Sequence, residues 1–229
     1  MSRRNQNITH DKSKAFAYKE AYNTLRVNLN FATFGGEVKK ILITSSIPSE
    51  GKTTISINLA STLAKAGNKV LLIEGDLRKP TFNKYMRVRN RGIVGFSSVL
   101  SGQVKVEDVI FKTKSNGFDV IFAGPIPPNP SELLERPNVK DVFDTLEPMY
   151  DYIIVDGNPV GVVSDSKLLG RHLDGALFVI RSDFVEKKVS VKALEELQNS
   201  GVKVLGGIVN RFDYKDEKHL YYYESDARG

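Results

Sequence analysis

Short runs of apolar residues alternate along most of the chain with longer segments that have helical periodicity. The apolar runs predict strands at residues 39–45, 69–74, 118–123, 152–155, 175–180 and 202–209. Helical spacing of apolar residues predicts helices at 53–66, 139–146, 164–169 and 187–198. Nearly continuous apolar strands separated by helices are typical of a parallel sheet that is covered by helices on both faces. The pattern therefore predicts an α/β fold with a mostly parallel central sheet.

The two ends of the chain have different patterns. Residues 1–14 are polar and basic, which predicts a flexible segment. Residues 15–34 form an amphipathic pattern that is closed by Gly35, so we expect a helix that packs on its own domain or forms an oligomer contact. Residues 15–212 are predicted to be one domain, followed by a tyrosine-rich tail at 213–229. The apolar positions of the helix are Phe16, Tyr22, Leu25, Leu29 and Ala32.

A candidate phosphate-binding loop, SSIPSEGKTT at residues 45–54, lies between a predicted strand and a predicted helix. Backbone N–H groups and the helix dipole at such a helix start attract an anion. We expect Lys52 to reach the terminal phosphates of a nucleotide and the Thr53 hydroxyl to bind Mg²⁺. The match is imperfect, because Ser46 replaces the first glycine of the usual pattern. The predicted nucleotide-binding residues of the loop are Ser49, Glu50, Gly51, Lys52, Thr53 and Thr54.

Acidic residues end two of the predicted strands. Glu74 and Asp76 follow one of them and share a face if the strand conformation continues. Asp156 ends the apolar run YIIVD, which has the form of a Walker B motif that holds a water in the Mg²⁺ shell. We therefore predict that Thr53, Asp76 and Asp156 form the metal site. Either Glu74 or Asp76 is the predicted proton acceptor.

Two further groups of residues are weaker candidates. Asn210 and Arg211 end the last predicted strand, where they could read a nucleobase amine and stack on the base. An ordinary strand-to-turn boundary explains them almost as well. The tail tyrosines are either phosphate acceptors or an interface cluster, and transfer to a hydroxyl of pKa about 10 needs a base and a shielded charge. These tyrosines are Tyr214, Tyr221, Tyr222 and Tyr223.

Composition removes several classes of site and partner. The sequence contains no Cys and 3 His, which excludes disulfides and cysteine nucleophiles and disfavours a zinc site. No apolar run reaches the length of about 18 residues that a membrane helix needs, so we expect a cytoplasmic protein. The net charge of +6 permits an anionic partner. We expect no nucleic acid, because the basic stretch lacks interleaved aromatic residues and is better explained as a solvated face. The stretch contains Lys84, Arg87, Arg89 and Arg91.

Together these motifs resemble the bacterial tyrosine kinases of capsule and exopolysaccharide synthesis, which belong to the P-loop NTPase superfamily. The resemblance spans nearly the whole chain and rests on PSEGKTT, LLIEGDLRKP, PPNPSELL at 127–134, IIVDGNPVG and the tyrosine tail. It implies an enzyme that uses ATP and Mg²⁺ to phosphorylate its own tail tyrosines, commonly between subunits of a ring. The implied catalytic residues are Lys52, Glu74, Asp76, Arg78 and Asp156.

The resemblance also implies partners and a location. We expect activation by the cytoplasmic segment of a transmembrane adaptor related to polysaccharide co-polymerases. That adaptor would recruit the kinase to the inner face of the plasma membrane, where it would regulate polysaccharide synthesis and export. A cognate tyrosine phosphatase would reverse the reaction.

Several positions depart from the pattern of the resembled family. Ser49 and Glu74 stand where Gly and Asp are usual, and Asn158 stands where Pro is frequent. An N-terminal arginine of the family is replaced by Asn23. Two alternatives therefore stay open: a partition or septum-positioning ATPase, and a catalytically weakened nucleotide-binding regulator. The first usually has a second lysine early in the phosphate loop, and residues 46–49 contain none.

Overall fold

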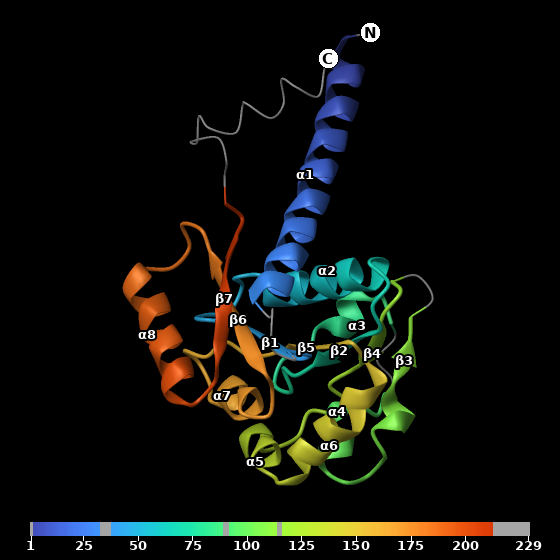
Figure 1. The fold of residues 1–229 in the computed structure, drawn as a ribbon, viewed down its shortest axis with the longest axis vertical. Helices are drawn as coiled ribbons and strands as arrows, with labels where there is room; N and C mark the ends of the chain where they lie inside the picture. The colour runs from blue at the N-terminus through green and yellow to red at the C-terminus, as the bar shows by residue number, and fades with distance from the viewer. Residues whose placement is uncertain (1, 33–37, 89–91, 114–115, 213–229) are drawn as a thin grey trace.

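The computed structural model describes residues 2–32, 38–88, 92–113 and 116–212, with side chains from residue 16 onward. A seven-stranded sheet with the order β3-β4-β2-β5-β1-β6-β7 forms its centre (Figure 1). Neighbouring strands are parallel except for the antiparallel pair β3 and β4. The predicted α/β fold with a mostly parallel sheet is therefore confirmed. The strands are β1 (Lys40–Ser45), β2 (Val70–Glu74), β3 (Phe111–Lys112), β4 (Asp119–Ile121), β5 (Tyr152–Asp156), β6 (Gly175–Arg181) and β7 (Val204–Asn210).

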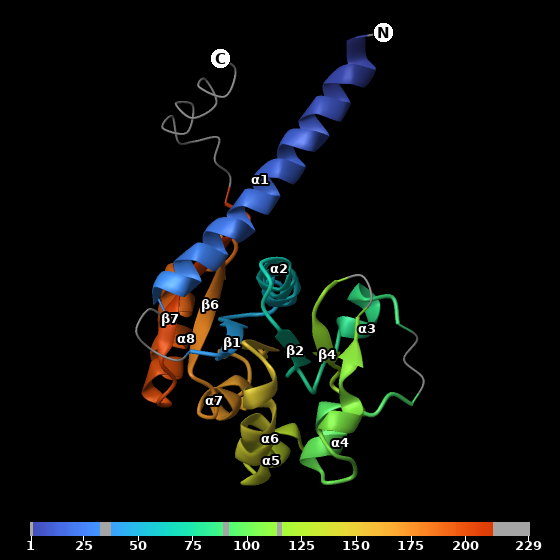
Figure 2. The same ribbon diagram turned by 45° about the vertical axis from the view of Figure 1, so that its right-hand side comes forward.

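Helices cover both faces of this sheet (Figure 2). Alternation along β2 explains the two layers, because Leu71 and Ile73 pack in one hydrophobic core and Val70 and Leu72 in the other. The first core contains residues from α4 to α8, and the second contains residues from α1, α2 and α3. The helices are α1 (Ser2–Ala32), α2 (Lys52–Lys65), α3 (Phe82–Tyr85), α4 (Phe96–Leu100), α5 (Pro130–Leu134), α6 (Asn138–Leu146), α7 (Asp165–Gly170) and α8 (Lys187–Asn199).

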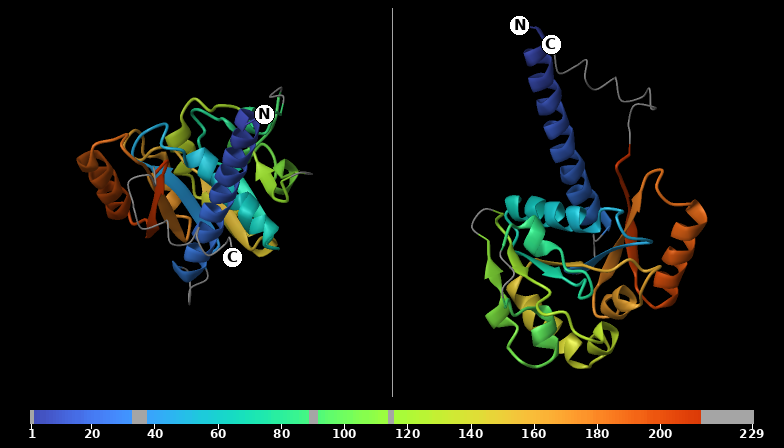
Figure 3. Two further views of the ribbon diagram at one scale, coloured as in Figure 1. Left: turned by 90° about the horizontal axis from the view of Figure 1, so that it is seen from above. Right: turned by 180° about the vertical axis from the view of Figure 1, so that it is seen from behind.

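Helix α1 differs from its prediction at the N-terminal end. It begins at Ser2, so residues 2–14 are helical rather than the flexible segment expected from their polarity. No Gly or Pro interrupts the helix, and nothing in the local sequence stops it. Leu29 is buried and Leu25 packs against the same core, which confirms the predicted packing face there. Phe16 is 68% exposed, so at this position only the predicted oligomer contact stays open. The N-terminal part of α1 projects from the body of the molecule (Figure 3).

Within the described ranges, no helix combines the length and apolar character needed to span a bilayer. The parallel strands β1, β2, β5 and β6 point the same way, so their carboxyl ends meet at one edge of the sheet. Ligands in open α/β sheets bind beyond this edge. The phosphate-binding loop follows β1 at this edge, next to the residues that follow β2 and β5.

Candidate active site

The phosphate-binding loop connects the buried end of β1 to the first residue of α2, Lys52. Gly51 precedes the helix with φ of 103°, and a Cβ added there would lie 2.1 Å from the Asn210 side-chain nitrogen. Only glycine therefore fits this position. Ser49 also has a left-handed backbone, with φ of 69°, a conformation that costs a non-glycine residue on the order of 1 kcal/mol. The loop thus holds its shape at some expense of backbone strain.

The side chains of Glu50 and Asn210 form hydrogen bonds that stabilise the phosphate-binding loop. The Glu50 carboxylate is fully buried and accepts hydrogen bonds from the Ser46 hydroxyl at 2.7 Å and the Ile47 N–H at 2.9 Å. The Asn210 amide donates to the Glu50 carbonyl oxygen at 2.7 Å. In the described chain both side chains therefore shape the loop, and base recognition by Asn210 and Arg211 stays a prediction.

Lys52 and Asp156 are opposite charges in the buried part of the site. Burial lowers the pKa of Lys52, an effect that the nearby carboxylates of Asp156, Asp76 and Glu50 oppose. The Asp156 carboxylate accepts hydrogen bonds from the Thr53 hydroxyl at 2.6 Å and from the Ser56 hydroxyl at 3.1 Å. Burial raises the pKa of Asp156 to about 7, although these hydrogen bonds and Lys52 favour its ionised form.

The oxygens at this position fit Mg²⁺. Thr53 and Asp156 supply a hydroxyl and a carboxylate beside the N-terminus of α2, and hard oxygen ligands are the ones that Mg²⁺ prefers. Among the residues that the structure describes, no group of three acidic, His or Cys side chains could hold a metal by itself. Such a sparse set suits a magnesium ion that takes its other ligands from water and phosphates.

The structure separates the two carboxylates that follow β2. The strand ends at Glu74, so the expected shared face with Asp76 does not form. Glu74 is 1% exposed, and its carboxylate accepts hydrogen bonds from the backbone N–H groups of Thr81, Phe82 and Ala123. Burial raises the pKa of Glu74 in spite of these bonds. Asp76 instead lines the cavity beside the loop.

The cavity has a volume of about 330 Å³ and lies between the phosphate-binding loop and the segments that follow β2 and β5. Lys52 and Asp76, which carry opposite charges, both line it. Other lining residues are Ser49, Gly51, Thr53, Thr54, Arg78, Lys79, Thr81, Tyr85, Asn158 and Val162.

Comparisons with known proteins agree with this geometry. A family model described as an AAA domain matches residues 38–170. The chain is 38% identical over 221 residues to tyrosine-protein kinase YwqD of Bacillus subtilis, across 96% of this chain and 92% of that protein. It is 35% identical over 218 residues to the putative tyrosine-protein kinase CapB of Staphylococcus aureus, across 95% and 94% of the two chains. The chain belongs to the family of bacterial protein-tyrosine kinases.

Solved structures place this kinase family member beside two classes of P-loop protein. The kinase domain of the Escherichia coli tyrosine kinase Etk matches with a TM-score of 0.79 and 34% identity, over 85% of this chain and 77% of that one. The septum site-determining protein MinD of Pyrococcus horikoshii, solved with Mg-ADP, matches with a TM-score of 0.65 and 26% identity, over 78% and 72%. The likeness to the kinase domain is greater on both measures.

Arg78 occupies a position in the kinase that its sequence context did not reveal. Its guanidinium donates from Nε to Asp165 Oδ2 at 2.7 Å and from Nη2 to Asp165 Oδ1 at 3.0 Å. The same Nη2 donates to the Ser131 hydroxyl at 2.8 Å. Arg78 therefore joins the segment after β2 to α5 and α7, while its contact with phosphate or substrate stays a prediction.

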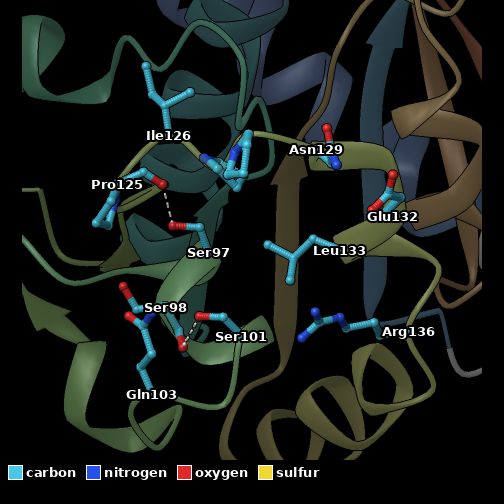
Figure 4. Close-up of a pocket in the computed structure, with 12 residues that line it drawn as sticks. Ser97, Ser98, Ser101, Gln103, Pro125, Ile126, Asn129, Glu132, Leu133 and Arg136 are labelled. Carbon is cyan, nitrogen blue, oxygen red and sulfur yellow. Dashed lines mark hydrogen bonds between the residues drawn. The ribbon is translucent and has the colours of Figure 1, made fainter.

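A second cavity, of about 340 Å³, lies between α4 and the segment that leads into α5 (Figure 4). Its walls contain Ser97 and Gln103 on one side and Glu132 and Arg136 on the other. The Ser97 hydroxyl donates to the Pro125 carbonyl oxygen at 2.6 Å, which fixes one wall to the other segment. The sequence PPNPSELL thus borders a cavity separate from the phosphate-binding loop.

The predicted phosphate acceptors lie outside the described residues. These are Tyr214, Tyr221, Tyr222 and Tyr223. Arg89 and Arg91 of the basic stretch lie outside them as well. Sequence reasoning also missed residues that the structure brings to the site: Ser56, Asn158 and Asp165.

Proposed function

We propose that this chain is an ATP-dependent protein-tyrosine kinase that transfers the γ-phosphoryl group of ATP to tyrosines of its own C-terminal tail. The main support for the proposal is the arrangement of four side chains. Lys52 and Asp76 line one cavity at the N-terminus of α2, beside the hydrogen-bonded pair Thr53 and Asp156. A cation, a candidate base and a candidate metal site therefore lie together, as transfer of a phosphoryl group to a hydroxyl requires.

Each residue has a distinct role in the proposed reaction. Lys52 and the loop N–H groups stabilise the charge of the transferring phosphoryl group. Thr53 and Asp156 hold Mg²⁺, which neutralises charge on the phosphates when it is bound. Asp76 takes the proton of the tyrosine hydroxyl as the tyrosine oxygen bonds to phosphorus and ADP leaves. We favour Asp76 over Glu74 because the Glu74 carboxylate is already occupied by backbone N–H groups.

Transfer between subunits is part of the proposal. Helix α1 exposes Phe16, Tyr18 and Phe31, which are 68%, 51% and 73% accessible in the single chain. Exposed aromatic side chains on one helix support association with another copy of the chain. The family resemblance supports a ring, activation by the cytoplasmic segment of a transmembrane adaptor, and reversal by a phosphatase. It also supports a role at the inner face of the membrane in polysaccharide synthesis and export.

The proposal is tested by mapping phosphotyrosine with mass spectrometry after incubation with Mg-ATP. The protein is incubated with and without the cytoplasmic segment of the adaptor, and the Lys52→Met variant is the control. Phosphate on Tyr221, Tyr222 or Tyr223 that depends on Lys52 supports the kinase. Phosphorylation that persists in the Lys52→Met variant contradicts the assigned site.

Assays of phosphate release and of ATP binding on the same protein separate the alternative functions. Release of inorganic phosphate that DNA or lipid stimulates, without phosphotyrosine, would indicate a partition-type ATPase. Tight binding of ATP with neither transfer nor hydrolysis would indicate a nucleotide-binding regulator.

A further inference from the structure

Asn158 connects the segment after β5 to the candidate base of the active site. Its side-chain nitrogen donates to Asp76 Oδ1 at 2.8 Å. A carboxylate oxygen can only accept, so the amide nitrogen faces Asp76 and the amide oxygen faces away. Asn158 is 3% exposed, and this hydrogen bond is therefore largely shielded from water.

One oxygen of Asp76 accepts every hydrogen bond that the described residues give to this carboxylate. Besides Asn158, the N–H groups of Arg78 and Lys79 donate to Oδ1 at 3.2 and 2.8 Å. Within the described chain, Oδ2 accepts no hydrogen bond from protein. The arrangement leaves the lone pairs of Oδ2 available to a group that enters the cavity.

The three groups that donate to Asp76 Oδ1 fix the carboxylate relative to different parts of the molecule. The N–H groups of Arg78 and Lys79 belong to the same loop as Asp76, so they fix the carboxylate only within that loop. Asn158 lies two residues after Asp156, which is hydrogen-bonded to Thr53. Of the three donors, only Asn158 therefore fixes Asp76 relative to the candidate metal site.

Stability alone does not explain an asparagine at this position. The Asn158 carbonyl oxygen accepts hydrogen bonds from the Thr44 hydroxyl at 2.7 Å and the Ser166 hydroxyl at 2.6 Å, which hold the backbone without the side chain. The side-chain oxygen is buried without a hydrogen-bond partner in the described structure, an arrangement that costs stability. A small apolar side chain would avoid this cost but could not donate to Asp76.

We propose that Asn158 is a positioning residue, which holds the Asp76 carboxylate so that Oδ2 faces the cavity beside the phosphate-binding loop. The proposal rests on the proposed function, in which Asp76 takes part in the transfer to tyrosine. In this proposal Asn158 acts through its hydrogen bond to Asp76, although it also lines the cavity. Without Asn158, the carboxylate is held only by its own loop and can shift relative to the candidate metal site. Misplacement of a catalytic group by about 1 Å can cost roughly 10²-fold in rate.

The test compares Asn158→Ala with the wild-type full chain by three measurements. They are the single-turnover rate of tyrosine phosphorylation with Mg-ATP, the Kd for Mg-ATP and the melting temperature. Loss of a residue that orients a functional group typically costs about 10- to 100-fold, so we expect the rate to fall by that factor. We expect the Kd to change by less than about threefold, because the phosphate-binding loop keeps its own contacts. The melting temperature should stay the same or rise, since the unpaired buried oxygen is removed.

Asn138→Ala is the matched control. Asn138 is partly buried and, like Asn158, has an unpaired side-chain oxygen in the described structure. Its side-chain nitrogen donates to the Leu100 carbonyl oxygen at 2.9 Å, away from Asp76. The control should leave the rate of transfer unchanged. An Asn158→Ala rate equal to that of the wild type, or a loss that follows a lower melting temperature, would overturn the proposal.

Crystal structures of the wild type and Asn158→Ala give a readout that does not depend on activity. We expect the Asp76 carboxylate to have one position in the wild type, and to be displaced from the candidate metal site or to occupy more than one position in the variant. An unchanged Asp76 would overturn the inference even if the chain is a kinase. A wild-type chain without phosphotyrosine would contradict the proposed function, and the position of Asp76 would still decide the role of Asn158.

Discussion

The phosphate-loop cavity and the cavity beside α4 have similar volumes, about 330 and 340 Å³, but different chemistry. The first contains the buried Lys52, whose charge interacts with the buried Asp156 carboxylate and with Asp76 on the cavity wall. In the second, Glu132 and Arg136 are exposed to solvent. Charges that are buried together have perturbed pKa values and strong interactions, whereas exposed charges are screened. The difference teaches that converging buried charges, rather than volume, identify the candidate active site.

The largest effect is expected when the positive charge of Lys52 is removed from the phosphate-loop cavity. We expect Lys52→Met to slow tyrosine phosphorylation by about 10³-fold, because it removes the cation that stabilises the transferring phosphoryl group. The initial rate of phosphotyrosine formation from labelled ATP measures this effect. Lys65→Met removes the same charge from the exposed last turn of α2 and should leave the rate unchanged. Equal losses in the two variants would show that net charge, rather than position, matters.

The next prediction separates the two carboxylates after β2. In Asp76→Asn, the amide oxygen can still accept the three hydrogen bonds that Oδ1 receives, while the amide nitrogen cannot take a proton. We expect transfer to slow by about 10²-fold, in the range for loss of a general base, with little change in stability. Rate measurements and urea unfolding of the same protein test both parts.

Glu74→Gln should lower stability more than the rate of transfer, which is the reverse of the result expected for Asp76→Asn. The amide nitrogen would face a backbone N–H group and leave at least one of the three backbone donors unpaired. We expect the free energy of unfolding to fall by about 1–3 kcal/mol, with a smaller effect on the rate of transfer than Asp76→Asn. A Glu74→Gln protein of normal stability that transfers phosphate slowly would make Glu74 the proton acceptor.

A smaller effect is expected at the ion pair between Arg78, in the segment after β2, and Asp165 of α7. Arg78→Met leaves the fully buried Asp165 carboxylate without its cation, with the Ser131 hydroxyl as a remaining partner. We expect the free energy of unfolding to fall by about 1–3 kcal/mol and transfer to slow by about tenfold, because the segment that carries Asp76 loses its link to α7. Urea unfolding and initial rates measure these changes. Ser131→Ala should have a smaller effect on both, and a larger one would assign the contact to α5 instead.

The sequence predicted the sheet and the phosphate loop because both depend on local patterns. The apolar runs identified the long parallel strands, and the short helices α3, α4 and α5 were missed because a single turn has too few residues to show a period. GKTT between a strand and a helix identified Lys52 and Thr53. These features need only neighbouring residues to be recognised.

The finer arrangement of the site depends on contacts between distant residues. Whether Glu74 or Asp76 faces the cavity follows from where β2 ends and from the N–H group of Ala123, which is 49 positions away in the sequence. The pairing of Arg78 with Asp165 spans 87 positions. Hydrogen bonds of this kind leave no periodic pattern in a single sequence, so only the fold could reveal them.

The smallest expected effect lies in the second cavity. Arg136→Met removes an exposed charge, and exposed substitutions usually change stability by less than about 0.5 kcal/mol, which corresponds to about a twofold change in an equilibrium. We therefore expect transfer by this variant to stay within about twofold of the wild type in the same initial-rate assay. Glu132 follows Ser131, the partner of Arg78, within α5, and Arg136 lies two residues after the end of this helix. A tenfold loss in Arg136→Met would mean that this wall of the second cavity acts on Asp76 through α5, so that the two cavities belong to one functional unit.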